Sequence, residues 1–325
     1  MTTELKADCQ LCSTISRTNG EDPIGTARHS DVWIILERSL PWIPDRLMAD
    51  PVIQPIFMLM KKLHEEKGVN LVPMLIAPDA EYSRSGDNRV IYYQHPNSAF
   101  SQYQKQEFLV PSDRQIALVT ALLNHPDNLS EFESFRQQSE SIRDIMVCTH
   151  GNVDVACARF GFPIYDRLQK DYSSDRLRVW RCSHFGGHQF APTLVDLPTG
   201  QFWGHLEADV LDTLVYRQGE VKKLRSFYRG WAGLSQFGQI VDRELWMRYG
   251  WPWLHYLRSE IAGDRDQSEF PDWVELRLEF AAPDNSDRGG YEARVEAIGS
   301  VKTMRQSGGE LTEVKQYRVT KCERY

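Results

Sequence analysis

The strongest constraint on the fold of this chain is one order of apolar segments that occurs twice. In the first half, a strand pattern precedes an amphipathic helix, three further strands and a helix, at residues 31–40, 49–68, 69–78, 88–96, 105–111 and 112–125. In the second half, segments of the same types follow in the same order, at residues 143–151, 153–172, 176–184, 192–198, 201–206 and 207–219. A strand–helix–strand unit followed by a hairpin and a helix is the thioredoxin-like order, so the repeat predicts an α/β protein with two thioredoxin-like lobes.

The last third of the chain has a different pattern. A helical region covers residues 234–263, with an interruption at Gly250 and Pro252, and three amphipathic strands follow it, at 272–280, 291–301 and 314–321. We therefore predict three units, an N-terminal lobe, a second lobe and a helical and antiparallel β extension, at residues 1–135, 136–220 and 221–325. A chain of 325 residues exceeds what one hydrophobic core usually organises, which agrees with several packed units.

Composition narrows the possible functions. Hydrophobic residues make up 41% of the chain and charged residues 26%, and the formal net charge is −7. A nucleic-acid-binding protein normally shows a basic face, and none is visible, so we expect no nucleic-acid partner. No apolar run approaches the roughly 20 residues of a membrane helix, and the N-terminus lacks the pattern of a signal peptide. We therefore expect a cytoplasmic protein.

Two cysteines and two histidines fall where the second lobe would place a site. Cys148 ends a predicted strand, Cys157 follows after eight intervening residues, and His184 and His188 follow the neighbouring strand. The carboxyl ends of strands in open α/β folds are where sites form. The Gly-Gly pair between the histidines lets the backbone turn tightly. Two thiolates and two imidazoles are therefore expected to converge at one edge of the sheet.

Three metal chemistries could use such a set. A mononuclear zinc ion accepts two cysteines and two histidines, and a 2Fe–2S cluster also takes four protein ligands, with two histidines on one iron in Rieske centres. A hydrolytic zinc centre would need H-E-x-x-H on a helix, and the segment HFGGH has no glutamate. The ligand types alone do not separate zinc from the cluster.

Other thiols and histidines are candidates of lower rank. Cys182 lies two residues before His184 and could replace a histidine as a ligand. Cys9 and Cys12 form a C-x₂-C pair in a flexible N-terminal arm, and we interpret them as inert thiols. We interpret His150, in the loop after Cys148, as a solvated loop residue.

The segments CTHGNVDVACARFGFPIYDRL and VWRCSHFGGHQFAPTLVDLPTGQFWGHL resemble the sucrase/ferredoxin-like family, as do GTARHSDVWIILE and YRGWAGLSQFGQ on either side. The resemblance covers most of residues 9 to 240, and it implies a thioredoxin-like ferredoxin domain with a 2Fe–2S cluster. By this resemblance, Cys148 and Cys157 would hold one iron, and His184 and His188 would hold the other. All-cysteine thioredoxin-like ferredoxins have C-x₃-C where this chain has the two histidines.

A mixed ligand set would raise the reduction potential and make it pH-dependent. Rieske-type centres lie at roughly −150 to +300 mV, against about −400 mV for all-cysteine plant-type ferredoxins. The implied function is a non-enzymatic electron carrier that docks to a redox partner protein. A zinc-stabilised or redox-sensing interaction protein is the alternative.

Two enzyme classes fit the sequence less well. A sucrose-cleaving hydrolase needs two carboxyl groups that flank the scissile bond, and no such pair stands out. A thiol–disulfide oxidoreductase would need C-x-x-C at the strand–helix turn, but Cys148 is followed by Thr-His-Gly.

Overall fold

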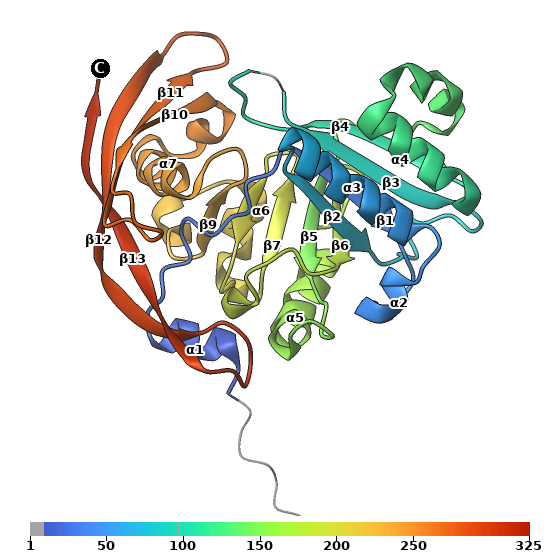
Figure 1. Ribbon diagram of the computed structural model, residues 1–325, viewed down its shortest axis with the longest axis horizontal. Coiled ribbons are helices and arrows are strands. Elements are labelled where there is room, and N and C mark those ends of the chain that lie inside the picture. Colours follow the sequence, from blue (N-terminus) through green and yellow to red (C-terminus); the bar gives the residue numbers. More distant parts are fainter. Residues whose placement is uncertain (1–9, 97) are drawn as a thin grey trace, which may run out of the picture.

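The computed structural model describes residues 10–96 and 98–325, and it contains a nine-stranded mixed sheet and a separate four-stranded antiparallel sheet (Figure 1). The predicted α/β class is therefore confirmed, as is an antiparallel extension at the C-terminal end of the chain. The strand order of the large sheet is β4-β3-β1-β2-β6-β5-β7-β8-β9. Strands from the first two predicted units thus form one continuous sheet.

The first half of this sheet comes from the N-terminal lobe. Its elements are β1 (Val32–Glu37), α2 (Pro44–Met48), α3 (Ile53–Lys67), β2 (Leu71–Ile76), β3 (Asn88–Gln94), β4 (Gln104–Val110) and α4 (Gln115–Asn124). The pair β1 and β2 is parallel, and β3 and β4 continue the sheet antiparallel on the other side of β1. Every residue of β1 is buried, because its alternate side chains enter two different cores.

Local sequence explains the bounds of α3. The Asp50 side chain accepts hydrogen bonds from the backbone N–H groups of Val52 and Ile53, which satisfies donors that the first turn leaves free. Gly68 ends the helix with a φ of 67°, in the left-handed region where glycine is favoured. The predicted helix is confirmed.

The second lobe repeats the arrangement. Its elements are β5 (Arg143–Cys148), α5 (Val155–Tyr172), β6 (Leu177–Cys182), β7 (Leu194–Leu197), β8 (Gln201–Trp203) and α6 (Leu211–Tyr216). Here β5 and β6 are parallel, and β7 and β8 add antiparallel strands beside β5. The repeated order agrees with the sequence pattern. The assignment of each lobe to the thioredoxin-like fold, and the divisions at residues 135 and 220, stay predictions.

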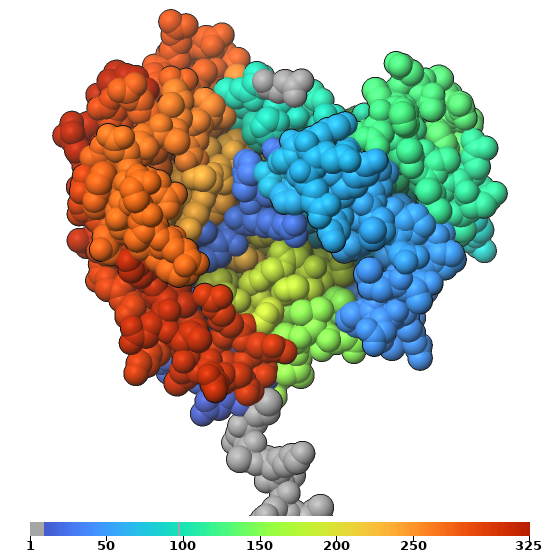
Figure 2. All heavy atoms as spheres, in the orientation of Figure 1, coloured from blue at the N-terminus to red at the C-terminus, as the bar shows by residue number. Residues whose placement is uncertain are grey.

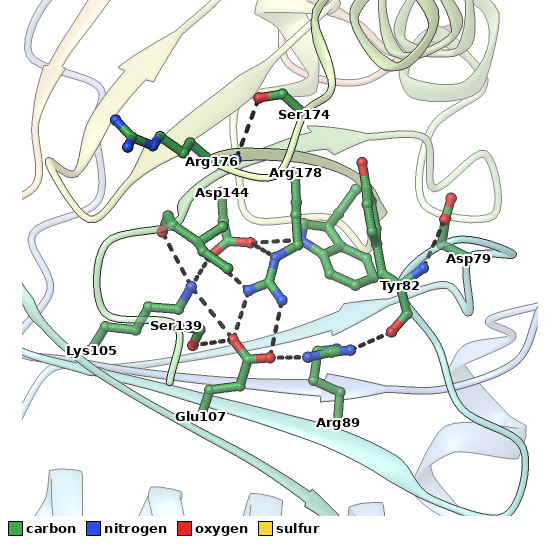
Figure 3. Close-up of polar contacts among 12 residues, drawn as sticks. Asp79, Tyr82, Arg89, Lys105, Glu107, Ser139, Asp144, Ser174, Arg176 and Arg178 are labelled. Carbon is green, nitrogen blue, oxygen red and sulfur yellow. Dashed lines mark hydrogen bonds and ion pairs between the residues drawn. The ribbon is translucent and has the colours of Figure 1, made fainter. Parts of the chain in front are cut away.

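The two lobes join through a short antiparallel pairing of β2 with β6, in which Ile76 lies opposite Cys182. A buried network of charges strengthens this junction (Figure 3). Arg178 of the second lobe donates to Asp144 at 2.9 Å and to Glu107 of the first lobe at 2.6 Å. Lys105 contacts Asp144, and Arg89 contacts Glu107. Since all five side chains are buried, each charge depends on the others for its compensation.

The C-terminal part begins with β9 (Tyr228–Trp231), a ninth strand of the large sheet that the sequence pattern did not indicate. Helix α7 (Gln236–Tyr249) then packs between the two sheets (Figure 1). The small sheet consists of β10 (Leu257–Arg265), β11 (Trp273–Ala281), β12 (Arg288–Met304) and β13 (Leu311–Arg324). Its apolar side chains on β11 alternate with exposed ones, as predicted.

The predicted interruption of the helical region at Gly250 is confirmed, but the prediction that the region continues as helix to residue 263 is wrong. Helix α7 ends at Gly250, whose φ of 73° lies in the left-handed region, and a short 3₁₀ turn at Trp251–His255 follows. The next residues form β10, because they pair antiparallel with β11 over most of their length. Strand pairing therefore overrides the local helical pattern here.

The N-terminal helix α1 (Cys12–Thr18) lies beside β12, near the turn that joins β12 to β13 (Figure 1). It also contacts a 3₁₀ turn at His188–Phe190. Helix α1 and the turn between β12 and β13 thus both lie beside the second lobe. Among the helices of the described residues, none is both long enough and apolar enough to span a membrane.

Candidate metal centre

The two cysteines of the predicted site lie at the junction of β5 with α5. Cys148 is the last residue of β5, and Cys157 lies in the first turn of α5. Asp154 caps that helix by accepting a hydrogen bond from the N–H of Ala156 at 2.8 Å. The cap fixes where the helix starts, so it sets the position of Cys157 relative to the end of the strand. Both thiols are buried, with exposures of 1% and 0%.

The structure brings three of the four predicted ligands together. The Nδ1 atom of His184 lies 3.9 Å from the Cys148 sulfur and 3.7 Å from the Cys157 sulfur. The ligand atoms of these three residues all lie within 4.8 Å of one another. His188 is next to them, with its ring centroid 5.2 Å from that of His184.

His188 also belongs to a second group of potential ligands. Its Nδ1 atom lies 3.3 Å from a carboxylate oxygen of Asp154 and 3.6 Å from the Cys12 sulfur. Ser307, in the turn between β12 and β13, donates to Asp154 from its hydroxyl at 2.7 Å and from its backbone N–H at 2.8 Å. Asp154 is therefore held by Ser307 while it faces His188. This contact leaves Nε2 as the ring nitrogen of His188 that is available to a metal.

Electrostatics in the pocket favour removal of one thiol proton. Contact with the Cys157 thiol and with His184 outweighs burial and lowers the pKa of the Cys148 thiol well below its ordinary value. The pKa of Cys157 is raised, first of all by its contact with Cys148 and then by burial. The pair thus releases its first proton readily and its second with difficulty, unless a metal ion replaces it.

The histidine side of the site faces outward. Both cysteines are buried, whereas His184 and His188 are half-buried. A cavity of about 380 Å³ opens beside His184, between the Gly186–Gly187 turn and Arg229. Figure 2 shows the chain around residues 155–190, in yellow-green, in a hollow between the red C-terminal strands and the blue N-terminal lobe. The site is therefore closed on its sulfur side and accessible on its imidazole side.

Comparison with known proteins shows the family of the chain. A sequence model of the sucrase/ferredoxin-like family matches residues 23–230, which is more than half of the chain. The chain belongs to the sucrase/ferredoxin-like family. Searches of curated proteins and of solved structures found no match.

The segment matched by the sucrase/ferredoxin-like family contains Cys148, Cys157, His184 and His188. It does not contain Cys12 or Ser307, which complete the surroundings of His188 in this member. The sequence interpretation missed these contacts, because they join residues far apart in the chain. Asp154 had a local signal, since an aspartate just before a helix is a typical N-cap.

Two interpretations of single residues in this sucrase/ferredoxin-like protein are wrong. Cys12 is not in a flexible arm but starts helix α1 with a fully buried thiol, and burial raises its pKa to about 11. His150 is not solvated: it is buried, its Nε2 lies 2.7 Å from the backbone oxygen of Trp42, and its Nδ1 accepts from the N–H of His184 at 3.3 Å. His150 thus connects the segment that begins at His184 to Trp42 of the first lobe. Cys9 lies outside the described residues.

Cys182 does not join either group of potential ligands in the described part of this family member. It is the strand partner of Cys148 and is fully buried. Burial and the neighbouring Cys148 raise its pKa well above the ordinary value. Because the Cys182 sulfur lies in neither group whereas the His184 ring lies in the first, the geometry favours the histidines as ligands.

Proposed function

We propose that Cys148, Cys157, His184 and His188 hold a 2Fe–2S cluster, and that the protein transfers single electrons to and from a redox partner protein. The observation that carries this proposal is the convergence of two buried thiols and the His184 ring within 4.8 Å, with the His188 ring beside them. A cluster of this type needs four protein donors, and mixed cysteine and histidine ligation is known in Rieske centres.

The donor set fits the group in two further ways. The two thiols are free cysteines that share one easily lost proton, which is a suitable state for binding iron as thiolates. Asp154 orients His188 through Nδ1, and a carboxylate behind a metal-bound imidazole is a common arrangement. When bound, the cluster supplies a one-electron couple. The chain's own residues bind it, exclude water from its sulfur side and orient the imidazole rings.

The same geometry supports a direction for electron exchange. His184 borders the open cavity and His188, next to it, is half-buried, whereas the two thiols are buried. We therefore propose that the partner protein docks over His184 and His188. The five described cysteines are unpaired, which suits the reducing cytoplasm. We also assign both lobes to the thioredoxin-like fold, on their shared strand order.

Anaerobic purification with iron and acid-labile sulfide analysis tests the proposal. We expect about two iron and two sulfide ions per chain, with visible absorption that decreases on reduction. The variants Cys148→Ala and His188→Ala should lose most of the iron. Cys182→Ala, which removes a buried thiol opposite Cys148, is the matched control and should keep it.

A different outcome would favour the alternative function. A colourless protein with one tightly bound zinc per chain, lost in Cys148→Ala, would contradict the cluster and support a zinc-stabilised interaction protein. Iron that remains bound in His188→Ala but is lost in Cys182→Ala would show that the ligand set is wrong.

A further inference from the structure

Arg229, in β9, is a buried cation whose hydrogen-bond partners are all uncharged. Its exposure is 2%, and its three hydrogen bonds all go to neutral oxygens: Nε to the Thr26 hydroxyl, Nη1 to the Gly186 carbonyl and Nη2 to the Thr26 carbonyl. The rings of Phe190 and Phe202 lie 5.4 and 5.5 Å from the guanidinium carbon. Throughout residues 10–96 and 98–325, no carboxylate pairs with it.

The other buried arginines of the described residues have charged partners. Each of them pairs with a carboxylate: Arg89 with Glu107, Arg178 with Asp144, Arg243 with Asp22 and Arg258 with Asp242. A buried charge without a partner costs several kcal/mol. Burial lowers the pKa of Arg229, and negative charge on Cys148 and Cys157, when these thiols are ionised, acts against that effect.

The guanidinium also shapes the turn between the two histidines. A Cβ atom at Gly187 would lie 2.3 Å from Nη2 of Arg229, and the φ of Gly187 is 79°. Glycine is therefore required there for two reasons, close approach and a left-handed backbone. Arg229 thus explains the second glycine of the segment HFGGH, whereas the first, Gly186, has open space around it and a φ of 101°, and its carbonyl accepts a hydrogen bond from Arg229.

We propose that Arg229 is a positioning residue of the centre, which holds the turn between His184 and His188 and whose uncompensated charge stabilises the reduced state of the cluster. This inference rests on the proposed function. An oxidised cluster with two thiolates and two neutral imidazoles has no net charge, and one electron from a reductant such as dithionite makes it mono-anionic, with no bond formed or broken. A fixed buried cation favours the mono-anion, so Arg229 raises the midpoint potential.

Two pairs of variants test the charge separately from the shape. Arg229→Gln removes the charge, and Arg229→Lys keeps it without the forked geometry. Thr26→Asp leaves Arg229 in place and gives its Nε a carboxylate partner, and Thr26→Asn is the neutral control of similar size. The measurements are iron content and the midpoint potential from an optical redox titration with mediators.

We expect Arg229→Gln and Thr26→Asp to shift the midpoint to lower potential, and Arg229→Lys and Thr26→Asn to stay closer to the wild type. Arg28→Gln changes an exposed arginine of the same cavity and should have a smaller effect, because solvent screens its charge. If Arg229→Gln does not retain iron, the midpoint potentials of Thr26→Asp and Thr26→Asn decide whether the charge of Arg229 acts on the cluster. Equal potentials in that pair would overturn the role of Arg229, whereas a wild-type chain without iron would refute the cluster itself.

Discussion

At the scale of single residues, the two histidines use the same ring nitrogen, Nδ1, for different contacts. His184 directs Nδ1 to the two thiols, whereas the Nδ1 of His188 faces the Asp154 carboxylate. A carboxylate in this position fixes the tautomer of an imidazole and makes its other nitrogen a better ligand. Asp154 thus has two roles, as the cap of α5 and as the partner of His188.

Asp154→Asn separates these roles, because asparagine is also a good helix cap. We expect the variant to fold but to release iron to a chelator about 10- to 100-fold more readily than the wild type. Iron release followed by absorbance, with far-ultraviolet circular dichroism to verify folding, measures this. Asp166→Asn, which changes a partly exposed carboxylate on the same helix, should behave as the wild type. Equal release rates in Asp154→Asn would show that the carboxylate does not support the ligand.

At the scale of elements, the packing of α5 on β5 determines how close the two thiols lie. Gly161 contacts the end of β5 so closely that a Cβ atom there would lie 2.0 Å from the Cys148 carbonyl oxygen. A larger residue must therefore push the helix away from the strand, and Cys157 moves with the helix.

Gly161→Ala should consequently weaken both the fold and the centre. Alanine favours a helix over glycine by about 1 kcal/mol, but overpacking costs about 1–3 kcal/mol, so we expect net destabilisation and loss of iron. Denaturant unfolding and iron analysis measure the two effects. Gln169→Ala introduces the same side chain later in α5 and is the control. A Gly161→Ala protein with the stability and iron content of the wild type would contradict this account of the packing.

The elements and the contacts between them differ in how far the sequence could predict them. Local patterns sufficed for α3, α5 and the strands of both lobes, because burial periodicity and caps lie within each segment. They failed for β10, where pairing with β11 overrides a helical pattern. The contact of Cys12 with His188 was also beyond local reasoning, since 176 positions separate the two residues in the chain.

At the scale of the whole molecule, the buried charges between the lobes link the two halves of the large sheet. Asp144 receives hydrogen bonds from Tyr93 and Lys105 of the first lobe and from Arg178 and Trp180 of the second. Burial alone would raise the pKa of Asp144, but Lys105 and Arg178 lower it well below its ordinary value. The carboxylate thus stays ionised and compensates cations from both lobes.

Asp144→Asn should destabilise the protein by about 3–5 kcal/mol at pH 7, because it leaves buried cations without a partner. The folded-state pKa of Asp144 is depressed, so its contribution is fully present above the unfolded-state pKa of about 4 and decreases as the pH falls below that value. The stability difference between wild type and variant should therefore narrow in acid. Urea unfolding at several pH values measures it, with the exposed Asp209→Asn as control. A difference that is constant between pH 7 and pH 3 would contradict the ionised state.

The contact of Ser307 with Asp154 has a consequence for biosynthesis. The surroundings of His188 are built from residues near both ends of the described chain and from its middle. The ribosome synthesises the second lobe before it synthesises the turn that contains Ser307. The environment of His188 is therefore completed only late in translation, so we expect the proposed cluster to enter the finished site in a late, largely post-translational step.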